Sequence, residues 1–234
     1  MKNLISALLI STVILSGCAE FRPEPKTSSP IETNLNSDTS DNQREETMFL
    51  NKNIGWKSVY HFQGMSHEDM ELYKTINGGK TWKEIANSEQ VGSTLPGGVK
   101  SGFTFVNEKE GWISANAPWE GKVGLFKTND GGVTWNEQMV KVPSVLERAQ
   151  IFAYPPLFFT KQKGILITRP DTKEHTLLYV TSDGGQNWES FIDDTNDQYL
   201  GIAWTLSKGI ATVKYDEKTW AISIQDLGKW SLQP

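Results

Sequence analysis

The sequence has few of the side chains that most enzymes use in catalysis. Its 234 residues include one cysteine and three histidines, and the formal net charge is −5. A single cysteine cannot form a disulfide within the chain. His61, His67 and His175 lack the i, i+4 pairing or HExxH spacing of a metal site. Nucleic-acid binding normally requires a basic excess, which is absent here. We therefore expect no metal, no cofactor and no nucleic-acid partner.

Long apolar runs are also missing, except at the start of the chain. Met1, Lys2 and Asn3 precede an apolar run over residues 4–15, which ends at the small residues Ser16 and Gly17. This order is typical of a secretory signal peptide. The run is shorter than the roughly 20 residues that a membrane-spanning helix needs. We predict that residues 1–17 are a cleaved signal peptide, and the alternative is an uncleaved anchor helix.

The single cysteine comes directly after this segment. Leu15-Ser16-Gly17-Cys18 resembles the lipobox of bacterial lipoproteins. The resemblance implies that the Cys18 sulfur is lipidated and that Cys18 becomes the mature N-terminus. Two or more acyl chains attach a protein stably to a membrane. We therefore expect an acylated, extracytoplasmic protein that is anchored to the cell membrane.

Residues 18–47 differ in composition from the rest of the chain. They are rich in proline, serine, threonine, asparagine and acidic residues, and they contain few large apolar ones. Such a segment cannot bury enough apolar surface to offset the entropy of the free chain. We predict a disordered tether over 18–47. Residues 48–234 are then long enough for one folded domain.

The domain contains internal repeats. Segments 75–82, 128–135 and 181–188 align without gaps, and their tryptophans lie 53 residues apart. A shortened fourth copy lies at 225–230. The Asn/Asp-Gly-Gly sequence within each full copy favours a hairpin turn. A fixed period of this length indicates a propeller or another repeat array.

A second signal follows the same period. An aromatic residue lies seven positions before a large apolar one in three units, and six positions before it in the fourth. The pairs are Phe49 and Trp56, Phe105 and Trp112, Phe158 and Ile165, and Trp204 and Ile210. Each unit is predicted to form four short strands. We therefore predict an all-β fold, a β-propeller of four four-stranded blades. The ring is small or open, or is completed by a second molecule.

The repeated segment resembles the Asp-box, or BNR repeat, of sialidases, sortilin-like receptors and photosystem II assembly factors, which are β-propellers. The resemblance implies that the repeated residues form structural turns and take no part in catalysis. These residues are Asn77, Gly79, Trp82, Asp130, Gly132, Trp135, Asp183, Gly185 and Trp188. Asn77 departs from the aspartate of the motif.

Arginine count argues against the best-known enzymes with this repeat. Sialidases bind the substrate carboxylate with three arginines. Arg22 and Arg44 fall in the predicted tether, which leaves Arg148 and Arg169 in the folded domain. Lysine is a poor substitute for the bidentate contact that arginine makes with a carboxylate. We predict no catalytic residue and no enzyme. A divergent glycosidase or lyase that uses two loop carboxylates on an envelope glycan is an alternative.

The loops opposite the repeated turns are the candidate binding surface, because binding residues concentrate in loops on a rigid scaffold. They are residues 63–70, 117–121, 169–175 and 215–219, with the connections 88–100 and 142–156. Aromatic and arginine side chains are common anchors, so Trp119, Arg148, Tyr154 and Arg169 are candidate contacts. Alternatively, Trp119 and Tyr154 cover the ends of the blades. The leading hypothesis is a non-enzymatic, membrane-tethered module that binds a protein or an envelope polymer. A purely structural envelope lipoprotein is the remaining alternative.

Overall fold

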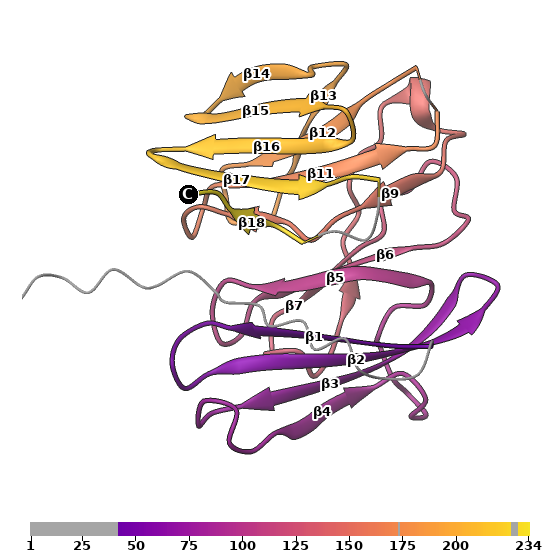
Figure 1. Cartoon of the computed structure of the whole chain (residues 1–234). Helices are drawn as coiled ribbons and strands as arrows, with labels where there is room; N and C mark the ends of the chain where they lie inside the picture. Colours follow the sequence, from indigo (N-terminus) through magenta and orange to yellow (C-terminus); the bar gives the residue numbers. More distant parts are fainter. Residues whose placement is uncertain (1–41, 173, 226–228) are drawn as a thin grey trace, which may run out of the picture.

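The computed structural model describes residues 42–172, 174–225 and 229–234. Within these ranges the chain forms four antiparallel sheets, called sheets 1 to 4 in chain order, and one 3-10 turn, η1 (Ser144–Leu146) (Figure 1). The predicted all-β class is therefore confirmed. The predicted signal peptide, Cys18 and most of the tether lie outside the described residues. In the part of the chain that is described, no helix has the length and apolar character needed to cross a membrane.

In sheets 1 and 2 every strand pairs with its neighbour in sequence, and sheet 3 follows the same order with one additional strand. Sheet 1 contains β1 (Gln43–Phe49), β2 (Gly55–Gly64), β3 (His67–Thr75) and β4 (Lys83–Asn87). Sheet 2 contains β5 (Val99–Phe105), β6 (Gly111–Asn116), β7 (Leu125–Thr128) and β8 (Asn136–Glu137). Sheet 3 contains β9 (Ile151–Ala153), β10 (Leu157–Phe158), β11 (Gly164–Pro170), β12 (Leu177–Thr181) and β13 (Glu189–Ile192). Both β9 and β10 pair with β11, because Pro155 and Pro156 between them have no N–H for the ladder.

The folded part begins earlier than the predicted boundary at Met48. Strand β1 starts at Gln43 and pairs with β2 from Gln43–His61 to Phe49–Gly55. The polar composition of this segment resembles a tether, but Glu46 is buried and has charged partners. The predicted tether 18–47 is therefore wrong for its last residues, and Arg44 belongs to the folded domain.

Aromatic stacking joins the first three sheets and explains the second repeat signal. Phe105 of sheet 2 stacks on Trp56 of sheet 1, with ring centroids 3.8 Å apart and an interplanar angle of 4°. Phe105 also meets the edge of the Trp135 ring, at 6.0 Å. Phe158 of sheet 3 lies in the same way between Trp112, at 4.6 Å, and Trp188, at 6.0 Å. In sheets 2 and 3, the aromatic residue that ends β5 or β10 thus packs against the preceding sheet.

The three repeated turns share one hydrogen-bond pattern. In the second turn, Asp130 Oδ1 accepts hydrogen bonds from the backbone N–H groups of Val133 (3.1 Å) and Thr134 (2.9 Å). Thr128 Oγ1 accepts one from the N–H of Gly132 (3.0 Å). Gly132 has a φ of +103°, and a Cβ there would lie 2.8 Å from Leu72 Cδ2. Glycine is required both by the backbone conformation and by the close packing of the turn on sheet 1.

Replacing Asp130 tests this turn. Asp130→Ala removes the acceptor for both backbone donors, and we expect a loss of about 1–2 kcal/mol in the free energy of unfolding. Asp130→Asn should lose less, because Asn77 fills the same position in the first turn, where its Oδ1 accepts from Thr81 N (3.0 Å). Urea unfolding of both variants measures the difference. Equal losses would show that the amide cannot replace the carboxylate.

The strands of the fourth sheet follow one another across the fold in the opposite direction to those of sheets 1 to 3. It contains β14 (Asn196–Tyr199), β15 (Ile202–Ser207), β16 (Ile210–Tyr215), β17 (Lys218–Ser223) and β18 (Ser231–Leu232). Residues 88–98 and 138–150 carry the chain from the last strand of one sheet to the first strand of the next, but only residues 193–195 join β13 to β14. This connection is too short to return the chain to the inner edge of the fold, where β1, β5 and β10 lie. Strand β14 therefore stays beside β13, where Phe191 packs on Tyr199 at 5.1 Å. Strands β17 and β18 lie toward sheets 1 and 2 (Figure 1).

This reversal changes which loops share a face. Gly78, Gly131 and Gly184 in the repeated turns each donate a backbone hydrogen bond to a loop of their own sheet: the β1–β2 loop, the β5–β6 loop and the β10–β11 loop, respectively. We call this end of the sheets the turn face, and the opposite end the loop face. Tyr215 lies on the turn face, stacked on Phe159 at 4.9 Å. Gln225 lies beside Tyr154 and Arg169 on the loop face.

One expectation about the fourth unit is therefore wrong. Residues 215–219 were expected on the loop face, but Tyr215 lies on the turn face. The shortened fourth copy of the repeated turn spans residues 225–230. Asp226 and Gly228 of that turn lie outside the described residues. Sheets 3 and 4 also have five strands instead of four. A salt bridge of 3.6 Å between Lys229 and Glu46 links the C-terminal segment to sheet 1.

Candidate binding site

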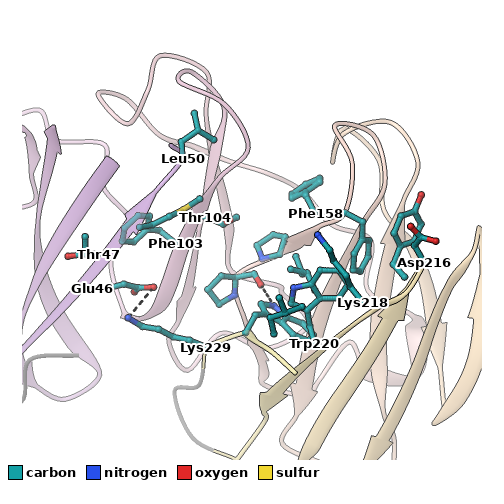
Figure 2. A pocket seen from close by; sticks show the side chains of 18 residues that line it. Glu46, Thr47, Leu50, Phe103, Thr104, Phe158, Asp216, Lys218, Trp220 and Lys229 are labelled. Atoms are coloured by element: carbon teal, nitrogen blue, oxygen red, sulfur yellow. Dashed lines mark hydrogen bonds and ion pairs between the residues drawn. The ribbon is translucent and has the colours of Figure 1, made fainter. Parts of the chain in front are cut away.

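A cleft of about 480 Å³ lies between sheet 4 and the inner strands of the other three sheets (Figure 2). We call it the central cleft. Its lining is mainly apolar and aromatic. The apolar and aromatic lining residues are Met48, Leu50, Phe103, Pro155, Pro156, Leu157, Phe158, Phe159, Tyr215, Trp220, Trp230 and Leu232. All four sheets or their connecting segments contribute to this lining.

An aromatic cluster forms one wall of the central cleft. Phe159 follows β10, stacks on Tyr215 at the end of β16, and meets Trp220 of β17 edge-on at 5.2 Å. All three side chains are half-buried. Trp230 donates an indole hydrogen bond of 2.9 Å to the carbonyl of Pro155, which fixes the ring beside the cluster. Half-buried aromatic rings on a rigid sheet can contact a ligand at low entropic cost.

Charged groups lie on opposite walls of the central cleft. Figure 2 shows Glu46 and Lys229 on one side and Asp216 on the other, with the aromatic residues between them. Lys218 is exposed and also lines the cleft. The two carboxylates therefore do not face each other as a close pair.

Glu46 is held by several partners. Arg44 lies 3.8 Å and Lys229 3.6 Å from its carboxylate oxygens, and the Tyr60 hydroxyl donates a hydrogen bond of 3.1 Å. Burial raises the pKa of Glu46, although Lys229 and Arg44 oppose the rise. Burial also raises the pKa of Tyr60 and lowers that of Lys229. Burial therefore disfavours the charged forms of both Glu46 and Lys229, and their mutual attraction offsets only part of that cost.

A second buried pair lies behind Glu46. Lys100 is fully buried, and its Nζ donates to the backbone carbonyl of Glu68. The Glu68 carboxylate accepts the Lys100 backbone N–H at 2.8 Å and lies 3.6 Å from Arg44. Burial lowers the pKa of Lys100 to about 8. Arg44 thus joins the two acidic side chains in the packed interior.

The predicted contacts on the loop face are brought together only in part. Tyr154 and Arg169 line a hollow of about 420 Å³, which we call the loop-face hollow. Tyr154 is buried, and its hydroxyl donates to the carbonyl of Ile224 at 2.6 Å. Tyr154 therefore packs between sheets 3 and 4, in agreement with the alternative that it covers a blade end.

Trp119 and Arg148 lie on neighbouring loops outside the lining of the hollow. The two loops are joined by a bridge between Glu120 and Gln150 and by a hydrogen bond of 2.9 Å from Gly121 N to Ala149 O. Trp119 is half-buried with Lys122 over its ring at 4.5 Å, and Arg148 is exposed. The structure thus places the four predicted residues on one face but not in one pocket.

The folded domain contains three arginines rather than two, because Arg44 lies in β1. They do not converge on one site. Arg44 contacts Glu46 and Glu68, and its guanidinium lies 3.9 Å from the Tyr60 ring centroid. Arg169 lines the loop-face hollow, and Arg148 is exposed on a neighbouring loop. No cluster of three or more metal-ligating side chains occurs among the described residues.

Sequence reasoning missed the central cleft. Its aromatic wall combines Phe159 of sheet 3 with Tyr215 and Trp220 of sheet 4, which meet only because sheet 4 is reversed. The short connection at 193–195 was the available signal, since it cannot cross from an outer to an inner strand.

Comparisons with known proteins give distant similarities. No family model matches the chain. The chain is 22% identical over 147 residues to "Vacuolar protein sorting/targeting protein 10" of Coccidioides posadasii (strain C735). The match covers 61% of this chain and 9% of that protein, so the chain spans less than a tenth of its relative. Among solved structures, the GH74 xyloglucanase from Xanthomonas campestris gives a TM-score of 0.34 at 15% identity, over 76% of this chain and 28% of that one.

Proposed function

We propose that this chain is a non-enzymatic binding module that takes a partner, a protein or an envelope polymer, in the central cleft. A lipid on Cys18 would hold the module outside the membrane. The observation that supports the proposal best is the half-buried aromatic wall of Phe159, Tyr215 and Trp220. Aromatic side chains at concave sites supply much of the binding energy of interfaces. The distant similarity to a sorting protein is compatible with a binding role.

The chemistry of the cleft favours binding over catalysis. Glu46 has three partners in its immediate surroundings, so a catalytic role would require its carboxyl group to exchange one of them for a substrate oxygen. The apolar lining suits a partner segment with apolar side chains or rings. Lys218 would add a favourable contact for an acidic group at the exposed end of that segment.

Site-specific cross-linking in the full-length protein tests the proposal. A photoreactive residue at Lys218 should give one discrete adduct in native envelopes, whereas the same residue at the exposed Lys80 should not. Trp220→Ala should weaken adduct formation about 30-fold, as expected when an anchor residue worth about 2 kcal/mol is removed. Trp119→Ala is the matched control on the other face and should leave the adduct unchanged.

Two results of this experiment would contradict the proposal. Adducts that survive Trp220→Ala, or the absence of any adduct from Lys218, would exclude a partner in the cleft. The second outcome would favour the purely structural envelope lipoprotein.

A glycosidase is the second candidate function, and one observation favours it. Glu46, with its raised pKa, and Asp216 both line the central cleft, and acid catalysis of glycoside hydrolysis uses a carboxyl group of raised pKa. Hydrolysis of an envelope glycan by the pure protein, lost in Glu46→Gln and in Asp216→Asn, would establish this candidate in place of the binding module.

A further inference from the structure

The loop-face hollow has a positively charged side chain in its lining and, among the described residues, no negatively charged one. Ten residues line it, and Arg169 is the one charged side chain among them. The walls beside Arg169 include Phe152, Pro118 and Val99, which are apolar. A ligand in this hollow would therefore meet a single positive group in mainly apolar surroundings. This hollow is separate from the central cleft, and the inference does not rest on the function proposed for that cleft.

The guanidinium of Arg169 is positioned by its neighbour in the sheet. Arg169 of β11 lies directly opposite Phe152 of β9, and Cζ lies 4.4 Å from the Phe152 ring centroid. Stacking on an aromatic ring holds the planar group in one orientation. A fixed planar donor is suited to bidentate contact with a carboxylate.

Arg169 also has unused hydrogen-bonding capacity. Its Nε is buried without a hydrogen-bond partner, and no carboxylate pairs with it in the part of the chain that the structure describes. The nearby Asp171 accepts from the backbone N–H of Gln150 at 3.1 Å instead. The Nε atom itself is closed off from solvent, so a ligand oxygen would meet the terminal nitrogens of the guanidinium, which have no carboxylate partner among the described residues.

We propose that the loop-face hollow binds a carboxylate of a partner protein, with Arg169 as its bidentate contact and Phe152 as the residue that positions Arg169. The partner segment carries an acidic side chain next to an apolar one. The acidic group pairs with the guanidinium, and the apolar group lies against Phe152 and Pro118.

The polar groups of the hollow favour a peptide over a sugar acid. A sugar needs several hydrogen-bond partners, but Asn116 is already used: its Nδ2 donates to Ser101 Oγ at 3.1 Å and its Oδ1 accepts from Ala153 N at 2.9 Å. The Tyr154 hydroxyl donates to Ile224 O. Ser66, Gln150 and Gln225 also line the hollow, but the apolar side chains of Phe152, Pro118 and Val99 beside Arg169 offer a sugar ring no hydrogen bond.

The test uses the full-length protein and two probes that differ only in charge, acetyl-Leu-Glu-amide and acetyl-Leu-Gln-amide. Binding is followed by the NMR shift of the arginine Nε–H resonances, assigned through the variants. We expect the glutamate probe to bind about tenfold more tightly, as a charge-assisted pair implies. Arg169→Gln should abolish this preference, and Arg169→Lys should retain only a small part of it. Phe152→Leu should reduce it.

Two controls separate this site from its surroundings. Arg148→Gln removes the exposed arginine on the neighbouring loop and should leave the preference intact. Trp220→Ala alters the central cleft and should also leave it intact, so the two proposals can fail separately. Equal binding of both probes, or a preference that survives Arg169→Gln, would overturn the inference. Tighter binding of glucuronate than of the glutamate probe would overturn the assignment of the partner as a protein.

Discussion

Replacing Trp112 with alanine is expected to lower the free energy of unfolding by about 3–5 kcal/mol, the range for large aromatic residues removed from a core. The Trp112 side chain is fully buried between sheets 2 and 3. Its ring packs on Phe158, and its indole N–H donates to Gln138 Oε1 at 2.9 Å. The substitution would therefore leave a cavity and an unpaired amide together. Urea unfolding followed by circular dichroism measures the loss.

Trp82→Ala is the matched control. Trp82 has the same place in its turn as Trp135 and Trp188, but its aromatic partner Phe49 belongs to the same sheet, which is the first one in the described part of the chain. The ring is half-buried, and we expect a loss of about 1 kcal/mol. Equal losses for Trp82→Ala and Trp112→Ala would contradict the view that stacking between sheets carries the stability.

The free energy of unfolding is expected to rise by about 1.5 kcal/mol between pH 8 and about 9.5. Lys100 is fully buried, and burial lowers its pKa from 10.5 to about 8 in the folded protein. In this range the unfolded chain still holds the Lys100 proton while the folded protein has lost it. Stability therefore increases with pH, because the unfolded state binds more protons. The lowered pKa of Lys229 acts in the same direction.

Urea unfolding at several pH values checks this dependence, with Lys100→Met as the comparison. Methionine has a similar length and no titrating group, so the variant should show a smaller rise over the same range. The range stops below pH 10, where unfolded tyrosines begin to ionise. A wild-type curve that is flat or falling between pH 8 and 9.5 would contradict the assignment of a buried, destabilising charge at Lys100.

Local features of the fold were predictable from the sequence. The spacing of Phe105 and Trp112 reflects a loop of fixed length between two strands, and the Asp-Gly-Gly turns fix their own geometry through nearby donors. Such signals depend on residues close in sequence, so a repeat pattern records them. The all-β class follows from this information.

Features that depend on distant partners were not predictable. Arg44 and Glu46 read as part of a polar tether, because nothing near them in sequence shows that Tyr60 and Lys229 surround Glu46 in the fold. Trp204 matched the repeat by spacing, yet it packs against Phe191 at the outer edge. The central cleft follows from that reversed placement. Arg169 was predicted to lie in a loop and lies in β11, but it was found because arginine is rare in this chain.

The reversed fourth sheet limits how such a protein could grow by duplication of its repeats. Sheets 1 to 3 present matching aromatic and turn surfaces, so an added copy between them would find compatible neighbours on both sides. A copy added after β18 would meet a sheet of the opposite orientation, with the mostly exposed strand β14 at its far edge. Sheet 4 therefore resembles the terminal units of solenoid proteins, whose atypical outer surfaces stop further stacking. In an evolutionary lineage, new repeats would be inserted before residue 193 and not after the last strand.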